Sequence, residues 1–294
     1  DGQDAARLNT PGWLWRSWRD AYGEDTCRRI AEAHLGEAPL DIAVTGDAVG
    51  WAERLGAEIL PGGVLRRWAG GAIVELPGYT DGEWWIQDAA AQMISGLLGD
   101  VAGKRVIDLC AAPGGKTAAL ASNGARVIAV DRSERRLARL SANLQRLGLS
   151  AEVVAEDAAE WRPAEAGDAV LLDAPCSATG TIRRHPDIPH LKSADDVKNL
   201  AAVQTRLLDA AVDMVGPGGR IIFCTCSLQP EEGPEQTAAL LARSASLTMD
   251  PVSAREIGGL DELIAIDGAF RSLPCHLAPL GGIDGFYAVR LRKA

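Results

Sequence analysis

Two cysteines follow apolar segments that each have the composition of a buried strand. The chain reads VLLDAPCS over residues 170–177, which contains Cys176, and IIFCTCS over residues 221–227, which contains Cys226. If these strands are neighbours in a parallel sheet, both thiols reach the same edge of that sheet. A cysteine thiolate is a strong nucleophile. The pair therefore predicts covalent catalysis in which two thiols have different tasks.

A turn of small residues, CAAPGGKT at 110–117, follows another apolar segment and precedes a helical pattern. Small residues let a ligand approach the backbone, and a helix start offers free N–H donors. The first candidate ligand is a nucleoside triphosphate, but its loop would need a glycine at the position of Cys110, and Pro113 stiffens the turn. The second is a dinucleotide, but the G-x-G-x-x-G spacing of dinucleotide folds is absent. The third candidate ligand is S-adenosylmethionine.

Acidic residues follow three successive predicted strands, at Asp108, Asp131 and Asp157. In a parallel sheet these side chains gather at one edge. Asp131 is placed to bind two ribose hydroxyls, as an acid does in dinucleotide folds, and Asp157 to contact an adenine amino group. A single aspartate is more often a turn or cap residue, but three in this arrangement favour a nucleoside-containing cofactor.

The elements that must position these residues alternate regularly from about residue 84. Near-continuous apolar strands that alternate with helices predict an α/β fold whose mostly parallel sheet is covered on both faces. A strand at 286–291 alternates in polarity and is predicted to be an antiparallel edge strand. The other predicted strands are 105–109, 126–130, 152–155, 169–172 and 220–224, and the helices are 85–98, one from about 115, 133–147 and 197–215.

The first 82 residues differ in composition from the rest. Seven of the eight tryptophans lie in residues 1–85. Short patterns predict helices near 12–20, 25–35 and 47–55 and strands near 39–45, 63–68 and 72–76. We therefore expect a small α+β domain at 1–82, a joint near GYTDG at 78–82, and a second domain at 83–294.

Bulk composition excludes several classes of protein. With 47% hydrophobic and 24% charged residues over 294 positions, the chain has the composition of a globular protein. There is no apolar run of membrane-spanning length and no signal peptide, and six cysteines lack the spacing of a disulfide framework. We expect a cytoplasmic monomer without a membrane partner. The net charge of −10 argues against binding to bulk nucleic acid.

Four motifs together resemble the Sun/Fmu family of RNA cytosine-5 methyltransferases, in particular the type that methylates bacterial 16S ribosomal RNA. They are CAAPGGKT at 110–117, DAPCS at 173–177, RHPD at 184–187 and TCS at 225–227. The resemblance covers about residues 83–293 and extends loosely to PGWL at 11–14. An N-terminal domain related to an antitermination factor is missing, and the chain begins without methionine. Ala43, Thr45 and Ala178 stand where the family has Arg, Asn and Gly.

The resemblance implies a Rossmann-like class I methyltransferase fold that binds S-adenosyl-L-methionine and methylates carbon 5 of a cytosine in RNA. It assigns Cys226 as the nucleophile and Cys176 as the thiol that assists release; the residues alone leave the two cysteines nearly symmetric. Asp173 would bind the exocyclic amine and N3 of the base, and Lys116 would lower the pKa of the thiolate. The expected cofactor residues are Cys110, Ala111, Ala112, Pro113, Gly114, Gly115, Lys116, Asp131, Asp157 and Asp173.

Basic residues around the cysteine motifs are predicted to form a rim that faces RNA phosphates. Unpaired or loop RNA is expected, because the base must leave its stack to react. The predicted rim comprises Arg183, Arg184, Lys192, Lys198, Arg290, Arg292 and Lys293, together with Arg132, Arg135, Arg139 and Arg146 of one helix. For the arginines of this helix, a solvated surface is the simpler interpretation.

Other interpretations compete with the family assignment. The protein could instead methylate transfer RNA, act as a noncatalytic RNA-binding assembly factor, or methylate a small molecule. The paired cysteines, together with Asp173 and Lys116, speak against the last two interpretations. Cys27, Cys224 and Cys275 have the composition of packed core thiols. A metal site built from Cys176, Cys224, Cys226 and His185 would have an uncommon spacing, so we expect no metal.

Overall fold

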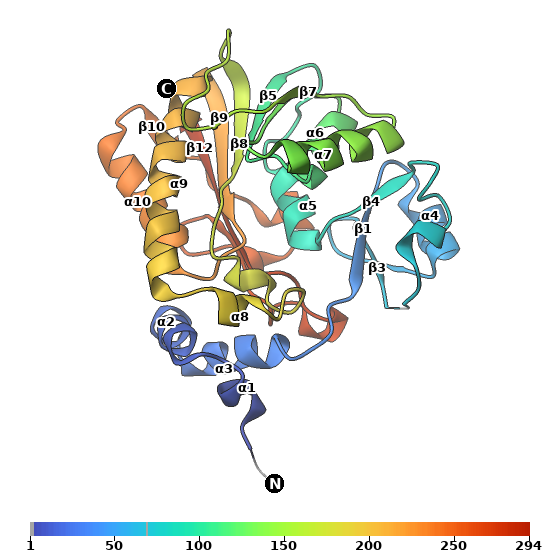
Figure 1. The fold of residues 1–294 in the computed structure, drawn as a ribbon, viewed down its shortest axis with the longest axis vertical. Coiled ribbons are helices and arrows are strands. Elements are labelled where there is room, and N and C mark those ends of the chain that lie inside the picture. The colour runs from blue at the N-terminus through green and yellow to red at the C-terminus, as the bar shows by residue number, and fades with distance from the viewer. Residues whose placement is uncertain (1–2, 69) are drawn as a thin grey trace.

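The computed structural model describes residues 3–68 and 70–294 and contains two sheets (Figure 1). The larger sheet has the strand order β10-β12-β9-β8-β5-β6-β7, with β11 paired to β12. The five strands from β9 to β7 are mutually parallel, and β12 is antiparallel to β9. This confirms the predicted mostly parallel α/β fold. The strands are β5 (Arg105–Leu109), β6 (Arg126–Val130), β7 (Glu152–Val154), β8 (Gly167–Asp173), β9 (Val215–Thr225), β10 (Leu247–Met249), β11 (Phe270–Ser272) and β12 (Phe286–Lys293).

The predicted edge position of the last strand is wrong. β12 lies between β10 and β9, so it is an internal strand. Its residues are buried from Phe286 to Leu291, because β11, β10 and β9 all pair with it. The alternating polarity of this segment arises from buried polar side chains such as Arg290, which is only 5% exposed.

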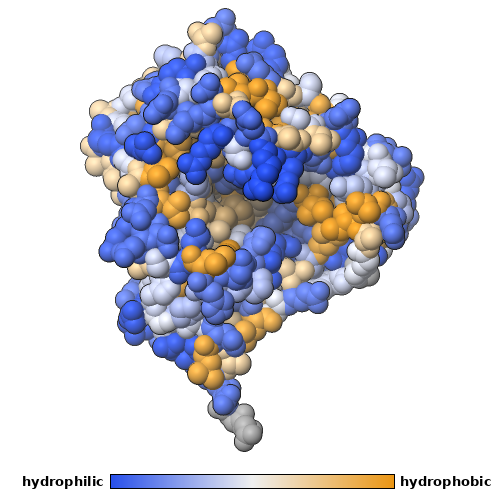
Figure 2. All heavy atoms as spheres, viewed as in Figure 1, coloured by the Kyte–Doolittle hydropathy of each residue, from blue (hydrophilic) through white to orange (hydrophobic). Residues whose placement is uncertain are grey.

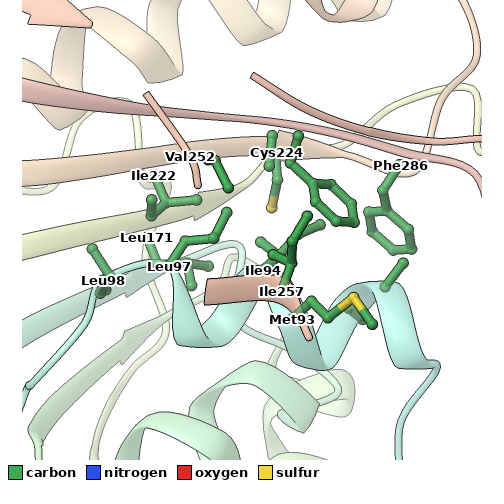
Figure 3. Close-up of a cluster of buried hydrophobic side chains, with 14 of the residues drawn as sticks. Met93, Ile94, Leu97, Leu98, Leu171, Ile222, Cys224, Val252, Ile257 and Phe286 are labelled. Carbon is green, nitrogen blue, oxygen red and sulfur yellow. The ribbon is translucent and has the colours of Figure 1, made fainter. Parts of the chain in front are cut away.

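Both faces of the larger sheet are packed, which explains why its strands are apolar without interruption. On one face, Ile222 and Cys224 of β9 join Met93, Ile94 and Leu97 in a cluster that Figure 3 shows around Phe286. On the other face, Ile221 and Phe223 pack against Leu207, Leu208 and Met214. The helices that supply these contacts and cover the sheet are α5 (Ala89–Gly96), α6 (Gly115–Ser122), α7 (Glu134–Arg146), α9 (Ala194–Met214) and α10 (Pro234–Arg243).

The smaller sheet is antiparallel and has the order β2-β3-β1-β4. It consists of β2 (Glu58–Ile59), β3 (Leu65–Arg67), β1 (Leu40–Val44) and β4 (Trp84–Ile86), with α4 (Ala48–Leu55) packed beside it. The helix predicted at 85–98 begins only at Ala89, because Trp84 and Trp85 pair with β1 and Asp88 caps the helix. The strand predicted at 72–76 is instead a 3₁₀ turn, η1 (Ile73–Glu75), closed by short-range backbone hydrogen bonds.

The first three helices pack against residues 182–188, 228 and 273–275. They are α1 (Ala5–Leu8), α2 (Gly12–Tyr22) and α3 (Glu24–Ala33). Trp18 donates from Nε1 to Gln229 Oε1 at 2.8 Å, and the Tyr22 hydroxyl donates to the Leu228 carbonyl at 2.6 Å. These helices therefore rest on the segment that follows Cys226, and a domain boundary near residue 82 stays a prediction. In the described part of the chain no helix is long and apolar enough to cross a membrane.

A buried ion pair ties the smaller sheet to the end of the chain. The Arg66 guanidinium donates to both carboxylate oxygens of Asp41 at 2.7 Å, and its Nη1 donates to the carbonyls of Leu280 and Gly282. Both charged side chains are at most 1% exposed. The Asp41 carboxylate also accepts the Ala89 N–H at the start of α5.

Removal of this cation should destabilise the protein strongly. Arg66→Met removes the bidentate partner of the buried Asp41 and leaves it only the longer contact with Arg184, at 3.9 Å. Breaking a buried pair in this way costs about 3–5 kcal/mol of unfolding free energy. Urea unfolding followed by circular dichroism measures the change. Arg19→Met serves as the control, since Arg19 pairs with Asp20 at the exposed surface, and its midpoint should remain close to that of the parent protein. Equal midpoints for both variants would contradict the structural role of the Arg66–Asp41 pair.

Candidate active site

The two cysteine thiols meet where neighbouring parallel strands end. β8 and β9 pair in parallel with Asp173 opposite Cys224. Each chain then turns, and the sulfurs of Cys176 and Cys226 come within 3.5 Å of each other. Both thiols are partly exposed. This confirms that the two cysteines reach one edge of the sheet.

Close backbone packing holds the turn after Cys176. The Gly180 N–H donates to the Cys226 carbonyl at 2.9 Å, and the Gly180 carbonyl accepts the Gly285 N–H at 2.8 Å. A Cβ on Gly180 would lie 1.9 Å from the Gly285 carbonyl oxygen, so only glycine fits. Ala178, where the family has glycine, adopts a left-handed conformation with φ of 59°. This conformation costs a non-glycine residue about 1 kcal/mol.

An ion pair between Asp173 and Lys116 lies beside the thiols. Lys116 comes from the first turn of α6, and its Nζ lies 2.7 Å from Asp173 Oδ2 and 5.1 Å from the centre of the Phe286 ring. Burial disfavours the charged amine, but Asp173 and nearby thiol groups outweigh that effect and raise the pKa of Lys116. Lys116 therefore stays positively charged and interacts with both the Asp173 carboxylate and the nearby thiol groups.

A third thiol contacts the same carboxylate. Cys224 Sγ lies 3.6 Å from Asp173 Oδ1, and burial, followed by the charge of Asp173, raises the pKa of the Cys224 thiol. Cys224 is fully buried, as expected for a core thiol, but its hydrogen bond to Asp173 is an additional function that the sequence analysis missed. The two-residue spacing from Cys226 is the signal that could have found it, because residues i and i+2 share a strand face.

The two catalytic thiol candidates are not equivalent. The hydrogen bond with Cys226 is the main cause that raises the pKa of Cys176, and burial adds to it. Cys176 therefore keeps its proton at neutral pH. Such a thiol can donate a hydrogen bond, or a proton, to the sulfur 3.5 Å away.

A separate hollow of about 150 Å³ lies over the ends of β5 and β6. Cys110, Asp131 and Asp157 line it together with Pro175. Asp131 accepts hydrogen bonds from the N–H groups of Ala112 and Ser133, which fixes the small-residue turn against the start of α7. The predicted acids of β6 and β7 are thus brought to one place.

The turn itself provides the close approach that its composition predicted. Ala111, Ala112 and Pro113 lead to Gly114, which has φ of 102° and would bring a Cβ within 2.7 Å of Leu140. Gly115 then begins α6. A hollow lined by carboxylates after two strands and by Cys110 of the turn fits the sugar and base of a nucleoside cofactor. Residues 111–116, which were also predicted to bind the cofactor, do not line this hollow.

Asp108 lies beneath this turn and is fully buried. Its Oδ2 accepts a 2.6 Å hydrogen bond from the Thr117 hydroxyl, while Oδ1 has no partner within the described residues. Burial raises the pKa of Asp108 to about 7, against the opposing effect of the Thr117 hydrogen bond. Asp108 thus supports the turn from below and does not line the hollow.

The predicted basic rim is wrong for the arginines that follow Cys176. Arg183 pairs with Asp284 at 2.7 Å, and Arg184 pairs with Asp88 at 2.9 Å and Asp284 at 2.8 Å. The Arg183 side chain is 2% exposed, since carboxylates distant in sequence enclose it. These arginines lock the Cys176 turn to the rest of the fold.

Two further members of the predicted rim also have internal partners. Arg290 pairs with Glu256 and Asp250, and Lys293 donates to the carbonyls of Val212 and Val215. Basic side chains also line the hollow over the ends of β5 and β6. They are Arg132, Arg206 and Arg136, of which Arg136 pairs with Asp131 at 3.2 Å. Figure 2 shows strongly hydrophilic surface near the start of α7 and an apolar patch over the smaller sheet, on either side of a central hollow.

Comparison with known proteins gives concordant matches. A family model described as 16S rRNA methyltransferase RsmB/F matches residues 96–292. "Ribosomal RNA small subunit methyltransferase B" of Vibrio cholerae is 40% identical over 82% of this chain and 59% of its own length. The protein of the same name from Shewanella oneidensis is 36% identical over 97% of this chain and 67% of its own. The chain spans about 60% of the length of the first curated relatives it matches.

Solved structures share the whole architecture. A methyltransferase homolog protein from Pyrococcus horikoshii has a TM-score of 0.81 at 26% identity and covers 99% of this chain and 98% of its own. The NSun6 structure from Pyrococcus horikoshii, determined with SFG, has a TM-score of 0.79 at 18% identity and covers 96% of this chain and 98% of its own. The second match supports the fold alone.

The buried position of Asp108 predicts a pH dependence of stability. Between about pH 3.9, the usual aspartate pKa, and about pH 7 the unfolded chain has lost this proton while the folded protein keeps it. Unfolding then releases a proton, so stability falls as the pH rises, by at most about 1.4 kcal/mol per pH unit. Asp108→Asn should remove this contribution, which urea unfolding at pH 5 and pH 8 can measure.

A second variant should extend the pH dependence caused by Asp108 and not remove it. Thr117→Val deletes the hydrogen bond that favours the charged form, so the loss of stability should extend to higher pH than in the parent protein. If Asp108→Asn and the parent protein show the same dependence on pH, Asp108 is ionised in the folded state and the assignment is wrong.

Proposed function

Because the chain belongs to the 16S rRNA methyltransferase RsmB/F family, we propose that it methylates carbon 5 of a cytosine in 16S ribosomal RNA with S-adenosyl-L-methionine. The observation that carries this proposal is the 3.5 Å approach of the Cys176 and Cys226 sulfurs at the ends of parallel strands. The Asp173–Lys116 pair lies on one side of them. Ribosomal RNA as the substrate class is supported by the names of the relatives.

Carbon 5 of cytosine is a weak nucleophile, so the first step must activate the ring. Cys226 Sγ adds to carbon 6: the S–C6 bond forms, the C5=C6 double bond shifts to C4=C5, the N3=C4 double bond opens with its electron pair on N3, and N3 takes the proton that the thiol loses. The Asp173 carboxylate accepts hydrogen bonds from the protonated N3 and from the exocyclic amine. The resulting enamine is nucleophilic at carbon 5, which divides one difficult step into easier ones.

S-adenosyl-L-methionine, when bound, supplies the methyl group as an electrophile. Cys110, Asp131 and Asp157 would hold it in the hollow beside the small-residue turn. This hollow is not lined by the other residues predicted to bind the cofactor, which are Ala111, Ala112, Pro113, Gly114, Gly115, Lys116 and Asp173. The C4=C5 pair forms the new bond from carbon 5 to the methyl group as N3=C4 re-forms. Release then requires that carbon 5 lose its proton to water, that the C5=C6 bond re-form, that the C6–S electron pair return to Cys226 and that N3 give up its proton, which restores the thiol. The protonated Cys176 stabilises the departing thiolate.

Substitution of the two cysteines should give different outcomes. Cys226→Ala removes the nucleophile and should abolish transfer of radiolabelled methyl groups to 16S ribosomal RNA. Cys176→Ala retains the nucleophile but lacks the donor that assists release, so a covalent protein–RNA adduct should accumulate. Denaturing gel electrophoresis detects this adduct as a slower band that ribonuclease removes. Cys275→Ala is the control, because that thiol is buried among the N-terminal helices.

Two results would sink parts of this assignment. A trapped adduct in Cys226→Ala but not in Cys176→Ala would reverse the two roles. Normal turnover in both variants would exclude the covalent mechanism while leaving methyl transfer itself in place.

RNA binding should depend only modestly on salt. At least five members of the predicted rim have internal partners, since Arg146 donates to the carbonyls of Tyr79 and Trp84 in addition to the four described above. The number of basic groups left for phosphates is therefore reduced. Each phosphate contact with a single strand contributes about −0.7 to the slope of log K against log salt, so a slope shallower than about −3 is expected. Filter binding across a series of KCl concentrations measures it. A steeper slope would show that other basic side chains contact the backbone.

A further inference from the structure

A buried carboxylate lies between the two cysteine turns. Glu232 ends the 3₁₀ turn η3 (Pro230–Glu232) and is 0% exposed. Its Oε1 accepts the Ser177 N–H at 2.8 Å and Gln204 Nε2 at 3.3 Å. Its Oε2 accepts the hydroxyls of Ser177 and, at 2.6 Å, Ser227. One side chain thus receives four hydrogen bonds.

The donors to Glu232 directly follow the two thiols. Ser177 comes after Cys176, and Ser227 comes after Cys226, and their hydroxyl oxygens are 3.1 Å apart. The Glu232 backbone carbonyl also accepts the Thr225 hydroxyl at 2.9 Å. The residues on both sides of Cys226, and the residue after Cys176, are therefore attached to a single glutamate.

Such a group is costly to bury, which argues for a purpose beyond packing. Burial raises the pKa of Glu232, and the hydrogen bonds from Ser177 and Ser227 oppose that rise. Among the described residues no lysine or arginine forms an ion pair with it. An apolar side chain would fill the same space without the desolvation cost, but it could not join the two turns.

We propose that Glu232 is the positioning residue that sets the separation of the Cys176 and Cys226 sulfurs. This inference rests on the proposed function, because the separation matters only if both thiols take part in one cycle. Glu232 lies behind the turns and acts through Ser177 and Ser227. Small displacements of reacting groups, of about 1 Å, can lower the rate about 100-fold.

Kinetics of three variants test the proposal. Glu232→Ala removes all four acceptor contacts, so kcat for 16S ribosomal RNA should fall about 100-fold while KM stays within about twofold. Glu232→Gln keeps a group that can bond both serines, since hydroxyls can accept as well as donate. Its kcat should stay within about tenfold of the parental value, as expected for one altered hydrogen bond.

Glu231→Ala, one residue earlier in the same turn, is the matched control and should retain parental kcat.

A geometric measurement separates this inference from the proposed function. Diamide oxidises two nearby thiols to a disulfide and is itself reduced to the hydrazine, and the rate depends on the approach of the sulfurs. Mass spectrometry detects the Cys176–Cys226 disulfide as a loss of two hydrogen atoms. The parental protein and Glu231→Ala should form it rapidly, and Glu232→Ala should form it at least about tenfold more slowly, which needs no methylation activity.

Each outcome decides one point. Parental kcat and disulfide rates in Glu232→Ala would overturn the positioning role. A parental protein that lacks methylation, combined with slow disulfide formation in Glu232→Ala, would sink the proposed function and leave the positioning role intact.

If Glu232→Ala does not fold, the Ser177→Ala/Ser227→Ala double variant removes the two hydroxyl links and keeps the glutamate in place. Unchanged kcat and disulfide rates in this double variant would equally overturn the inference.

Discussion

The parallel pairing of β8 with β9 is the constraint on which the rest of the site depends. Its register places Asp173 opposite Cys224, so the carboxylate and the buried thiol contact each other without any loop being involved. Both strands then turn at the same edge, and this brings together two sulfurs from positions fifty residues apart in the chain. A slip of one residue would turn every side chain of β9 to the opposite face and separate the groups. The apolar contacts on both faces of β9 therefore fix the chemistry as well as the fold.

Buried charges supply the second constraint, because they determine where the turns lie relative to the body. Arg183 and Arg184 bind Asp88 and Asp284, which come from the start of α5 and the approach to β12. Coulombic attraction from the two arginines overcomes burial and lowers the pKa of Asp88. These arginines hold the loop after Cys176 in place, and this structural role explains why they are buried and do not face solvent.

The sequence predicted best where one physical pattern dominates. β5 and β6 were bounded correctly because residues 105–109 and 126–130 are apolar runs between turns, and such runs form buried parallel strands. The strand predicted at residues 72–76 is a 3₁₀ turn, because so short an apolar run does not by itself distinguish a strand from a turn. The roles of Arg183, Arg184 and Glu232 could not be predicted, because their side-chain partners lie between 5 and 145 positions away and the type of a charged residue does not reveal its partner. The convergence of the thiols was predictable, whereas the hydrogen-bonded support behind them was not.

The same proximity explains why two chemically identical thiols can have different tasks. Two sulfurs 3.5 Å apart lie close enough for one thiol to donate a hydrogen bond to the other. Cys176, whose pKa is raised chiefly by its bond to Cys226, is the member that keeps the proton. In the proposed cycle this hydrogen bond would be absent while Cys226 is bound to carbon 6 and would form again as its sulfur leaves. The 3.5 Å spacing would then serve both attack and release without a separate acid.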